Sequence, residues 1–258
     1  MLPYFFRHYD SIVDRYFVWD SGSTDRSLDL LRHHRRVTVG RFERGESFIL
    51  SATAHYNECW KVSRGAADWV IVVNVDEHLY HPRLRSYLRS RGGAGVSIVI
   101  AEGYHMVSHT FPWTRQPLWR VLPHGARDRH WDKPQVFDPN RIQEINFAPG
   151  RHAAEPIGNV GVVRTNAVRL LHYKYLGADY LQTRHAELRS VFPESDLARG
   201  WGYQYSWDAA QNREALRRHQ AAAVNVVRGA RRMRKRTGRF PVADAVGGEA
   251  DAGVPVHS

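Results

Sequence analysis

Two acidic segments of the sequence have residue types and spacing that suit a divalent cation. The first covers residues 20–25 (DSGSTD), and the second covers residues 74–77 (NVDE). Side chains two positions apart on an extended chain point the same way, so Asn74 and Asp76 can face one cavity together. Mg²⁺ and Mn²⁺ accept carboxylate oxygens and share their other positions with phosphates and water. A cation held there would neutralise a diphosphate leaving group, so the pattern indicates a nucleotide-diphosphate platform.

Each acidic segment follows a short apolar run that is typical of a strand. Residues 16–19 (YFVW) precede the first segment, and residues 68–73 (DWVIVV) precede the second. The second run is continuously apolar and β-branched, which fits a strand buried on both faces of a parallel sheet. Ligands of open α/β sheets bind at the carboxyl ends of the strands. Asp20 and Asp25 also suit ordinary turn and helix-cap roles. A structural role explains Asp76 less well, because this acid comes directly after the apolar run 68–73.

The remaining patterns alternate between helix and strand. Further strands are predicted at residues 37–39 and 96–101, and helices at the ranges 1–14, 25–34, 49–65 and 82–91. This order predicts an α/β fold with an open, mostly parallel, Rossmann-like sheet flanked by helices. The second half is richer in Pro, Gly, His and Trp. Its strand-like pieces are residues 135–137, 161–163 and 168–171, and helical patterns return at 178–190 and 207–218.

The net charge of +11 is concentrated near the carboxyl end. Ten of the 37 Lys and Arg residues fall in residues 213–239, where Glu214 is the single acid. We therefore divide the chain into a body, residues 1–212, and a basic helical extension with a disordered tail, residues 213–258. Basic residues near an anionic membrane contribute about 1 kcal/mol each, so residues 213–239 are expected to attract an anionic membrane surface, unless they are a solvated extension with no partner. No aromatic residues alternate with the charges to stack on bases, and no nucleic-acid partner is expected.

Composition excludes several other classes. One cysteine, Cys59, rules out an internal disulfide framework and a multi-cysteine zinc site. The longest apolar runs are far shorter than the ~20 residues of a membrane-spanning helix. The start of the sequence, MLPYFFRHYD, lacks the pattern of a secretory signal. We expect a cytoplasmic protein, peripheral at the inner membrane surface if the basic extension binds lipid.

The two acidic segments, taken as a pair, resemble glycosyltransferase family 2, in its small family-2-like branch. The resemblance covers roughly residues 1–210 and implies a GT-A fold. Its matching segments are residues 2–9 (LPYFFRHY), 19–25 (WDSGSTD), 67–77 (ADWVIVVNVDE), 133–137 (KPQVF), 150–152 (GRH) and 171–174 (LHYK).

The resemblance implies roles for individual residues. Asp20, with Ser21 and Asp25 in the same turn, matches the segment that holds the nucleotide, Asp25 being the more structural of the two acids. Asn74 and Asp76 match the family D-x-D, whose last acid binds the metal ion on the diphosphate. His172 matches a position that supplies a further metal or phosphate contact. Residues expected to line the substrate cleft are Glu77, Lys133 and His152. The implied cofactor is a divalent cation, Mn²⁺ or Mg²⁺.

Two features depart from the family pattern. Asn74 replaces the first acid of the D-x-D, which removes one negative charge and should weaken metal binding. The family also begins with a strand ahead of the helix that reads here as residues 2–9, and that strand is missing from this chain. We expect the natural start to lie upstream of Met1, or the domain to be incomplete.

The catalytic base is chosen among loop acids. An inverting transfer needs a carboxylate that takes the proton of the acceptor hydroxyl as it attacks the anomeric carbon. Asp132 is the first choice, with Glu102 and Glu155 as alternatives.

The leading hypothesis is a metal-assisted, inverting glycosyltransferase. It would move a sugar from a nucleotide-diphosphate donor, with UDP-sugars favoured, to a saccharide or lipid-linked acceptor. The alternatives are a catalytically impaired remnant that binds sugar or nucleotide and, from another class, a nucleic-acid-binding protein acting through residues 213–239.

Overall fold

The sequence of the first helix explains both where the helix starts and which face it buries. In the computed structural model, which describes residues 1–227, the helix at Leu2–Tyr9 starts with a proline in its first turn, where proline's missing amide hydrogen costs nothing. Its residues Leu2, Phe5, Phe6 and Tyr9 lie at helical spacing and are buried together in one core cluster.

Helices, strands and short 3₁₀ helices follow one another along residues 1–227 in this order: α1 Leu2–Tyr9, β1 Tyr16–Asp20, α2 Ser27–Arg32, β2 Val37–Arg41, α3 Phe48–Glu58, η1 Lys61–Ser63, β3 Val70–Ile71, β4 Glu77–Tyr80, α4 Leu84–Gly93, β5 Ile98–Ser108, α5 Leu118–Val121, β6 His124–Arg127, η2 Arg129–Trp131, β7 Val136–Phe137, β8 Ile142–Glu144, η3 Pro149–Arg151, β9 Ile157–Gly158, β10 Val162–Leu176, α6 Ala178–Val191, α7 Glu194–Ala198, η4 Tyr203–Ser206, α8 Ala209–Ala221 and β11 Val224–Asn225.

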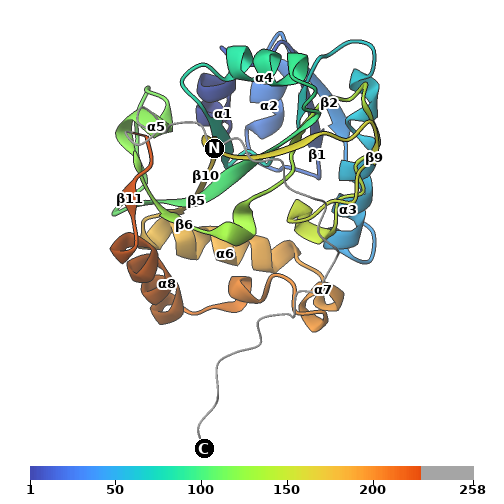
Figure 1. The fold of residues 1–258 in the computed structure, drawn as a ribbon. Coiled ribbons are helices and arrows are strands. Elements are labelled where there is room, and N and C mark those ends of the chain that lie inside the picture. The colour runs from blue at the N-terminus through green and yellow to red at the C-terminus, as the bar shows by residue number, and fades with distance from the viewer. Residues whose placement is uncertain (228–258) are drawn as a thin grey trace, which may run out of the picture.

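The main sheet has seven strands between two helical layers. Five strands follow the order β11-β6-β5-β10-β4, and β3 joins β5 through β7. Figure 1 shows α1, α2 and α4 on one side of the sheet and α6 and α8 on the other. The long strands β5 and β10 are mostly buried and form its centre. They position the central residues of the candidate site.

The mixed α/β class is confirmed, but the sheet is more mixed than the sequence predicts. Among the described residues, β5 with β10 and β1 with β2 form the parallel pairs. The strands β4, β6 and β7 join their neighbours in antiparallel pairs. β7 falls within the strand-like piece predicted at residues 135–137. β4 and β6 were not predicted; each is four residues long, and such short pieces lack the clear period that identifies a strand from sequence.

β1 and β2 form a separate two-stranded sheet, and β3 is only two residues long although the apolar run spans residues 68–73. In residues 1–227, β3 pairs with β7 alone and β1 pairs with β2 alone, so each has one unpaired edge. A strand is defined by its ladder of hydrogen bonds. β3 is therefore no longer than its partner β7, which also has two residues.

β5 and β10 stay in register over the segment that matters for the site. Arg169 pairs with Glu102 and His172 pairs with His105, and register shifts lie just before and just after this stretch. β4 lies on the other side of β10, where Glu77 pairs with His172. Three strands thus bring residues 77, 105 and 172 into one row.

The predicted boundary after residue 212 falls inside α8. Leu216 and Val226 are buried, and β11 pairs with β6 at the edge of the main sheet. The predicted helical extension therefore continues α8 only to Ala221 and then adds a strand. The rest of that prediction, residues 228–258, lies outside the described residues.

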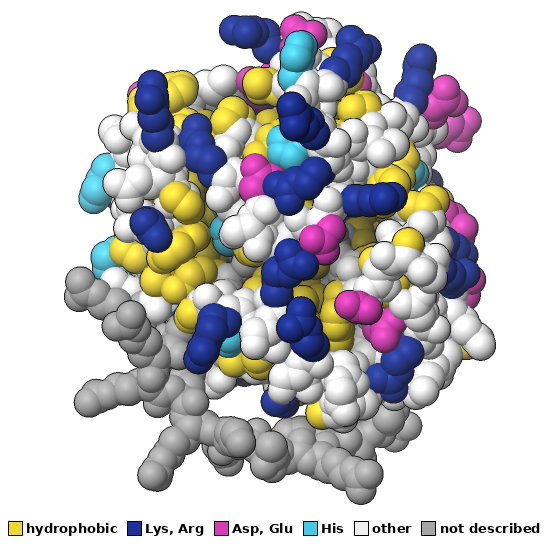
Figure 2. Space-filling model, turned by 90° about the horizontal axis from the view of Figure 1, so that it is seen from above, with side chains coloured by type: hydrophobic (Ala, Val, Ile, Leu, Met, Phe, Trp, Pro, Cys, Tyr) yellow, Lys and Arg dark blue, Asp and Glu magenta, His cyan; other side chains and the backbone are white. Residues whose placement is uncertain are grey.

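Charge is spread over the face that carries α1, α2 and α4. Figure 2 shows Lys and Arg side chains dispersed across it, with acidic side chains between them. On this face they do not form one continuous basic stripe of the kind that follows a nucleic-acid backbone. Within residues 1–227 no helix combines the length and apolar character needed to cross a bilayer.

Candidate active site

Asp76 and His172 meet where β4 begins beside β10. The Tyr173 amide donates a hydrogen bond to the Asp76 carbonyl oxygen at 2.8 Å, which ties the two segments together. Asp76 Oδ2 lies 3.4 Å from His172 Nε2. Burial alone would raise the pKa of Asp76, but the adjacent His172 imidazole lowers it below its ordinary value. The two residues predicted as metal ligands are therefore brought together.

The His172 ring is held from its second nitrogen and from its face. Its Nδ1 lies 3.0 Å from Nδ1 of His105, whose Nε2 lies 3.0 Å from Asp128 Oδ2. Trp131 stacks on His172 with ring centroids 3.8 Å apart. Gly103 makes room for this tryptophan, because a Cβ at position 103 would lie 2.4 Å from the Trp131 carbonyl oxygen.

The surroundings of His105 and Asp128 lower the pKa of both side chains. Burial lowers the pKa of His105 to about 3, although the hydrogen bond with Asp128 opposes this. Burial would raise the pKa of Asp128, but the hydrogen bond with His105 prevails and lowers it to about 2. The pair is thus a neutral imidazole on an ionised carboxylate. Neither residue was among the predicted site residues.

Glu77 occupies the centre of a buried ionic cluster. Its side chain is fully buried and contacts Lys133 Nζ at 2.7 Å and Arg151 Nη2 at 2.8 Å. Desolvation would raise the pKa of Glu77, but these two cations lower it far below its usual range. Burial lowers the pKa of Lys133 to about 8, with Glu77 acting in the opposite direction. With all of these charged atoms paired and buried, a direct substrate contact by Glu77 or Lys133 stays a prediction.

The same cluster fixes Asn74. Its backbone amide donates to Glu77 Oε2 at 3.0 Å. Its side-chain oxygen accepts from the Tyr56 hydroxyl at 3.0 Å and from Arg151 Nη1 at 3.3 Å. Those two donors already use the oxygen that a cation would need. Asn74 therefore shapes this rim of the site, and its role as a nucleotide or metal contact remains a prediction.

The first acidic segment is satisfied largely by its own loop. Asp20 accepts hydrogen bonds from the amides of Gly22 at 2.8 Å and Ser23 at 3.1 Å, and these bonds lower its pKa against the opposing effect of burial. Asp25 accepts from the Ser27 amide at 2.9 Å, which lowers its pKa. Ser21 Oγ accepts from Arg44 at 3.1 Å. Within residues 1–227, no hydrogen bond or ion pair joins this loop to Asp76 or His172.

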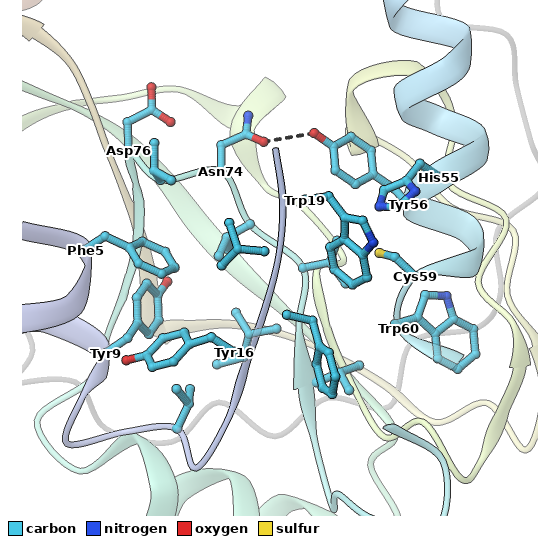
Figure 3. Close-up of a pocket in the computed structure, with 18 of the residues that line it drawn as sticks. Phe5, Tyr9, Tyr16, Trp19, His55, Tyr56, Cys59, Trp60, Asn74 and Asp76 are labelled. Atoms are coloured by element: carbon cyan, nitrogen blue, oxygen red, sulfur yellow. Dashed lines mark hydrogen bonds between the residues drawn. The ribbon is translucent and has the colours of Figure 1, made fainter. Parts of the chain in front are cut away.

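The two acidic segments still face a shared space. The charges of both Asp25 and Asp76 act on the amino group of Met1, whose pKa is lowered by its burial and by Arg184. A cavity of about 1030 Å³ extends between β1 and β3, and its lining reaches from Ser21 to Asp76. Figure 3 shows Asn74 and Asp76 along one side of this cavity, with Tyr16 and Trp19 below them in this view. Its walls combine apolar and aromatic side chains with charged ones, among them Arg15, Arg85 and Arg89.

The remaining predicted residues lie around Trp131. His152 contacts the edge of Trp131 and stacks on His130 at 3.9 Å, and burial lowers the pKa of His152 to about 3. Lys133 Nζ lies 3.8 Å from the centre of the Trp131 ring. Asp132 uses one carboxylate oxygen for the Gly103 amide at 2.8 Å and the other for Arg127 at 2.7 Å. Asp132 thus lies beside β5, and its role as the base remains a prediction.

The residues at Asp76 and His172 fit a divalent cation as a two-ligand site. In residues 1–227, no group of three or more His, Cys, Asp and Glu side chains is placed to hold a metal ion. One carboxylate and one imidazole would leave the other positions to phosphate oxygens and water, which is how Mg²⁺ is often bound beside nucleotides. A nitrogen ligand beside an oxygen ligand suits Mn²⁺ better than Mg²⁺.

Comparison with known proteins adds little. No protein-family model matches the chain, and no curated protein matches it. Among solved structures, residues 1–349 of TarS from S. aureus are similar over 83% of this chain and 65% of that chain, at 10% identity and a TM-score of 0.36. The chain therefore spans slightly less than two thirds of that protein chain. A likeness this weak carries no argument about fold or function, so the assignment must come from the site itself.

Proposed function

We propose that this chain is a glycosyltransferase that moves a sugar from a nucleotide-diphosphate donor to an acceptor hydroxyl. The observation that carries the proposal is the convergence of Asp76 and His172, 3.4 Å apart, at the polar end of the 1030 Å³ cavity. A diphosphate can reach this point while the nucleoside lies toward the Asp20 loop. UDP-sugars are the favoured donors, and the acceptor is a saccharide or a lipid-linked sugar.

A divalent cation held by Asp76 and His172 would neutralise the diphosphate as it leaves. The chain's own residues prepare this place. Trp131 and His105 hold the His172 ring, and the ion pairs of Glu77 hold the segment 74–77. Preorganised groups of this kind cost no rearrangement when charge develops. For inverting transfer we propose Asp132 as the base that takes the acceptor proton, with its carboxylate aimed by Gly103 and Arg127.

We propose that the part of the cavity between the edges of β1 and β3 is the place of one further strand, and that the donor uses the end at Asn74 and Asp76. The unpaired edges of β1 and β3 both line it, and so do the apolar side chains of Val18 and Ile71. Filling it would join the two-stranded sheet to the main sheet, as the GT-A fold requires.

The second candidate is a protein that binds sugar or nucleotide without turnover. Two observations favour it: Asn74 brings no charge to the site, and the sheet is open between β1 and β3. Both functions predict donor binding, but only the enzyme predicts cation-dependent cleavage of the sugar-phosphate bond.

Donor binding and donor cleavage, measured separately, test the proposal. We expect UDP-sugar and Mn²⁺ to bind together by calorimetry, and UDP to be released when an acceptor is added. Asp76→Ala should lose both activities because the cation loses its carboxylate. Glu214→Ala, which removes an exposed acid paired with Arg217 on α8 and away from the cavity, is the matched control. Unchanged UDP-sugar and Mn²⁺ binding in Asp76→Ala would show that Asp76 does not hold the cation and would reject the proposed site. Binding without UDP release would favour the second candidate.

We also propose an anionic membrane surface as a partner of residues 213–239. The described part of this range leaves Arg213, Arg217 and Arg218 exposed on α8. The test is sedimentation with phosphatidylserine vesicles of the full chain and of a chain ending at Val227. The shorter chain keeps α8 and β11 and should bind less, and equal binding would reject the partner.

A further inference from the structure

Four side chains, two on the strands β5 and β10 and two on the segments beside β4 and β6, form a continuous row. Asp76 Oδ2 faces His172 Nε2 at 3.4 Å, His172 Nδ1 faces His105 Nδ1 at 3.0 Å, and His105 Nε2 faces Asp128 Oδ2 at 3.0 Å. The two histidines are about 95% buried, while Asp128 is one-third exposed at the far end. The row therefore connects the proposed cation site to the surface beside β6.

The hydrogen positions in this row follow from the donors and acceptors available. An ionised carboxylate can only accept hydrogen bonds, so His105 must carry a proton on Nε2 to bond Asp128. A buried ring that faces a second imidazole holds one proton, which leaves Nδ1 of His105 as an acceptor. The 3.0 Å contact between the two Nδ1 atoms then requires His172 to donate from its Nδ1.

We propose that Asp128 and His105 are positioning residues that fix a proton on His172 Nδ1, so that Nε2 is the atom left to share a cation with Asp76. This inference rests on the proposed function only in that Nε2 and Asp76 are its cation ligands. Two acceptors 3.4 Å apart are a favourable pair only with a cation or a proton between them. Metal-ligating histidines usually donate their other nitrogen's proton to a second partner, which fixes the ring. Here that partner is an imidazole backed by a carboxylate.

Ring packing prevents the imidazoles of His172 and His105 from turning over to exchange their hydrogen-bonding nitrogens. Trp131 covers one face of His172 at 3.8 Å with the planes 16° apart. His105 contacts the edges or faces of Trp131, Tyr175 and His219 at ring distances of 5.1–5.3 Å. With both rings packed, a change at Asp128 is passed on as a change of proton position rather than of ring position.

Asp128→Asn tests the inference because an amide can reverse the direction of the hydrogen bonds along the row. Its NH₂ group can donate to His105 Nε2, which moves the His105 proton to Nδ1 and the His172 proton to Nε2, where it competes with the cation. We expect ¹⁵N NMR of histidine-labelled protein to show a proton on His172 Nδ1 in the unchanged chain, and a proton on Nε2 with none on Nδ1 in Asp128→Asn. With Mn²⁺ alone as the probe, calorimetry should show affinity about 10- to 100-fold lower in Asp128→Asn.

Two variants serve as controls. Asp128→Glu keeps a carboxylate and should retain the Nδ1–H form of His172 and most of the Mn²⁺ affinity. Glu214→Gln removes one negative charge from a surface pair on α8 and should change neither readout. The Nε2–H form in the unchanged chain, or an unaltered His172 tautomer in Asp128→Asn, would overturn the inference. The expected tautomer without any Mn²⁺ binding would support the positioning role and reject the cation site of the proposed function, so the two failures are distinguishable.

Discussion

The two acidic segments look alike in sequence, yet different kinds of partner hold them in the structure. The segment after β3 is held by partners from other strands: Asp76 by β10 and Glu77 by two buried cations. The segment after β1 is held mainly by amides within its own turn. An acid at the end of a strand becomes a built site only when neighbouring strands bring long-range partners to it. The main-sheet side of the cavity has such partners, and the β1–β2 side does not.

The largest expected difference between the two sides is in stability. Glu77→Gln leaves Lys133 and Arg151 as buried charges without their partner, and breaking a buried pair in this way costs about 3–5 kcal/mol. Asp25→Asn weakens one exposed turn and should cost less than about 1 kcal/mol. Urea unfolding of the two variants measures both changes. Similar losses of unfolding free energy in the two variants would contradict the claim that only the segment after β3 depends on long-range partners.

Acid should affect the main-sheet side first. Burial lowers the pKa of His8 to about 4 and of His105 to about 3, from an ordinary value of 6.5. Below pH 6.5 the unfolded chain takes up protons that the folded chain refuses, so stability is full above 6.5 and falls as the pH drops toward 3. Asp20 and Asp25 have lowered pKa values, so their contribution is lost only below about 3.8. The unfolding free energy, measured from pH 8 downward, should therefore decline well before pH 4. A free energy that stays flat to pH 4 would contradict this order.

The smallest difference concerns single backbone amides at the cavity. The Tyr16 amide donates to Arg36 and the Val72 amide to Gln135, at 2.8 and 2.9 Å. Amides alternate along a strand, so those of Phe17 and Ile71 point to the unpaired edges. Hydrogen exchange followed by NMR should be faster at Phe17 and Ile71 than at Tyr16 and Val72. Equal protection of all four would mean that another segment already pairs there.

The sequence predicts the elements better than their lengths. Strands at β1 and β2 and the helices near α2, α4 and α6 fall close to their predicted ranges, because local apolar patterns and turn residues mark them. β5 was predicted to end at Ala101, since Glu102 and Gly103 resemble a strand end, yet it continues to Ser108. Likewise β10 joins two predicted pieces across the polar residues 164–166. Tertiary pairing, which no local pattern reveals, extends both strands.

The same limit explains which site residues were found. Asp76 and His172 were singled out on residue type and resemblance, and the structure places them together. His105 was missed because it lies on the unpredicted half of β5, and its partner is 67 positions away along the chain. Asp128 carries no local signal beyond being a loop acid. Long-range register decides these contacts.

The two irregularities that bracket residues 169–172 of β10 have a consequence for variation in this protein. Because strand side chains alternate between faces, a slip by one position would send the imidazole of His172 to the opposite face of the sheet. Bulges absorb an extra residue locally, so insertions of one residue at either irregularity can be tolerated, while the same insertion between them would disconnect the row from Asp76. Length changes here should therefore be confined to the two bulges.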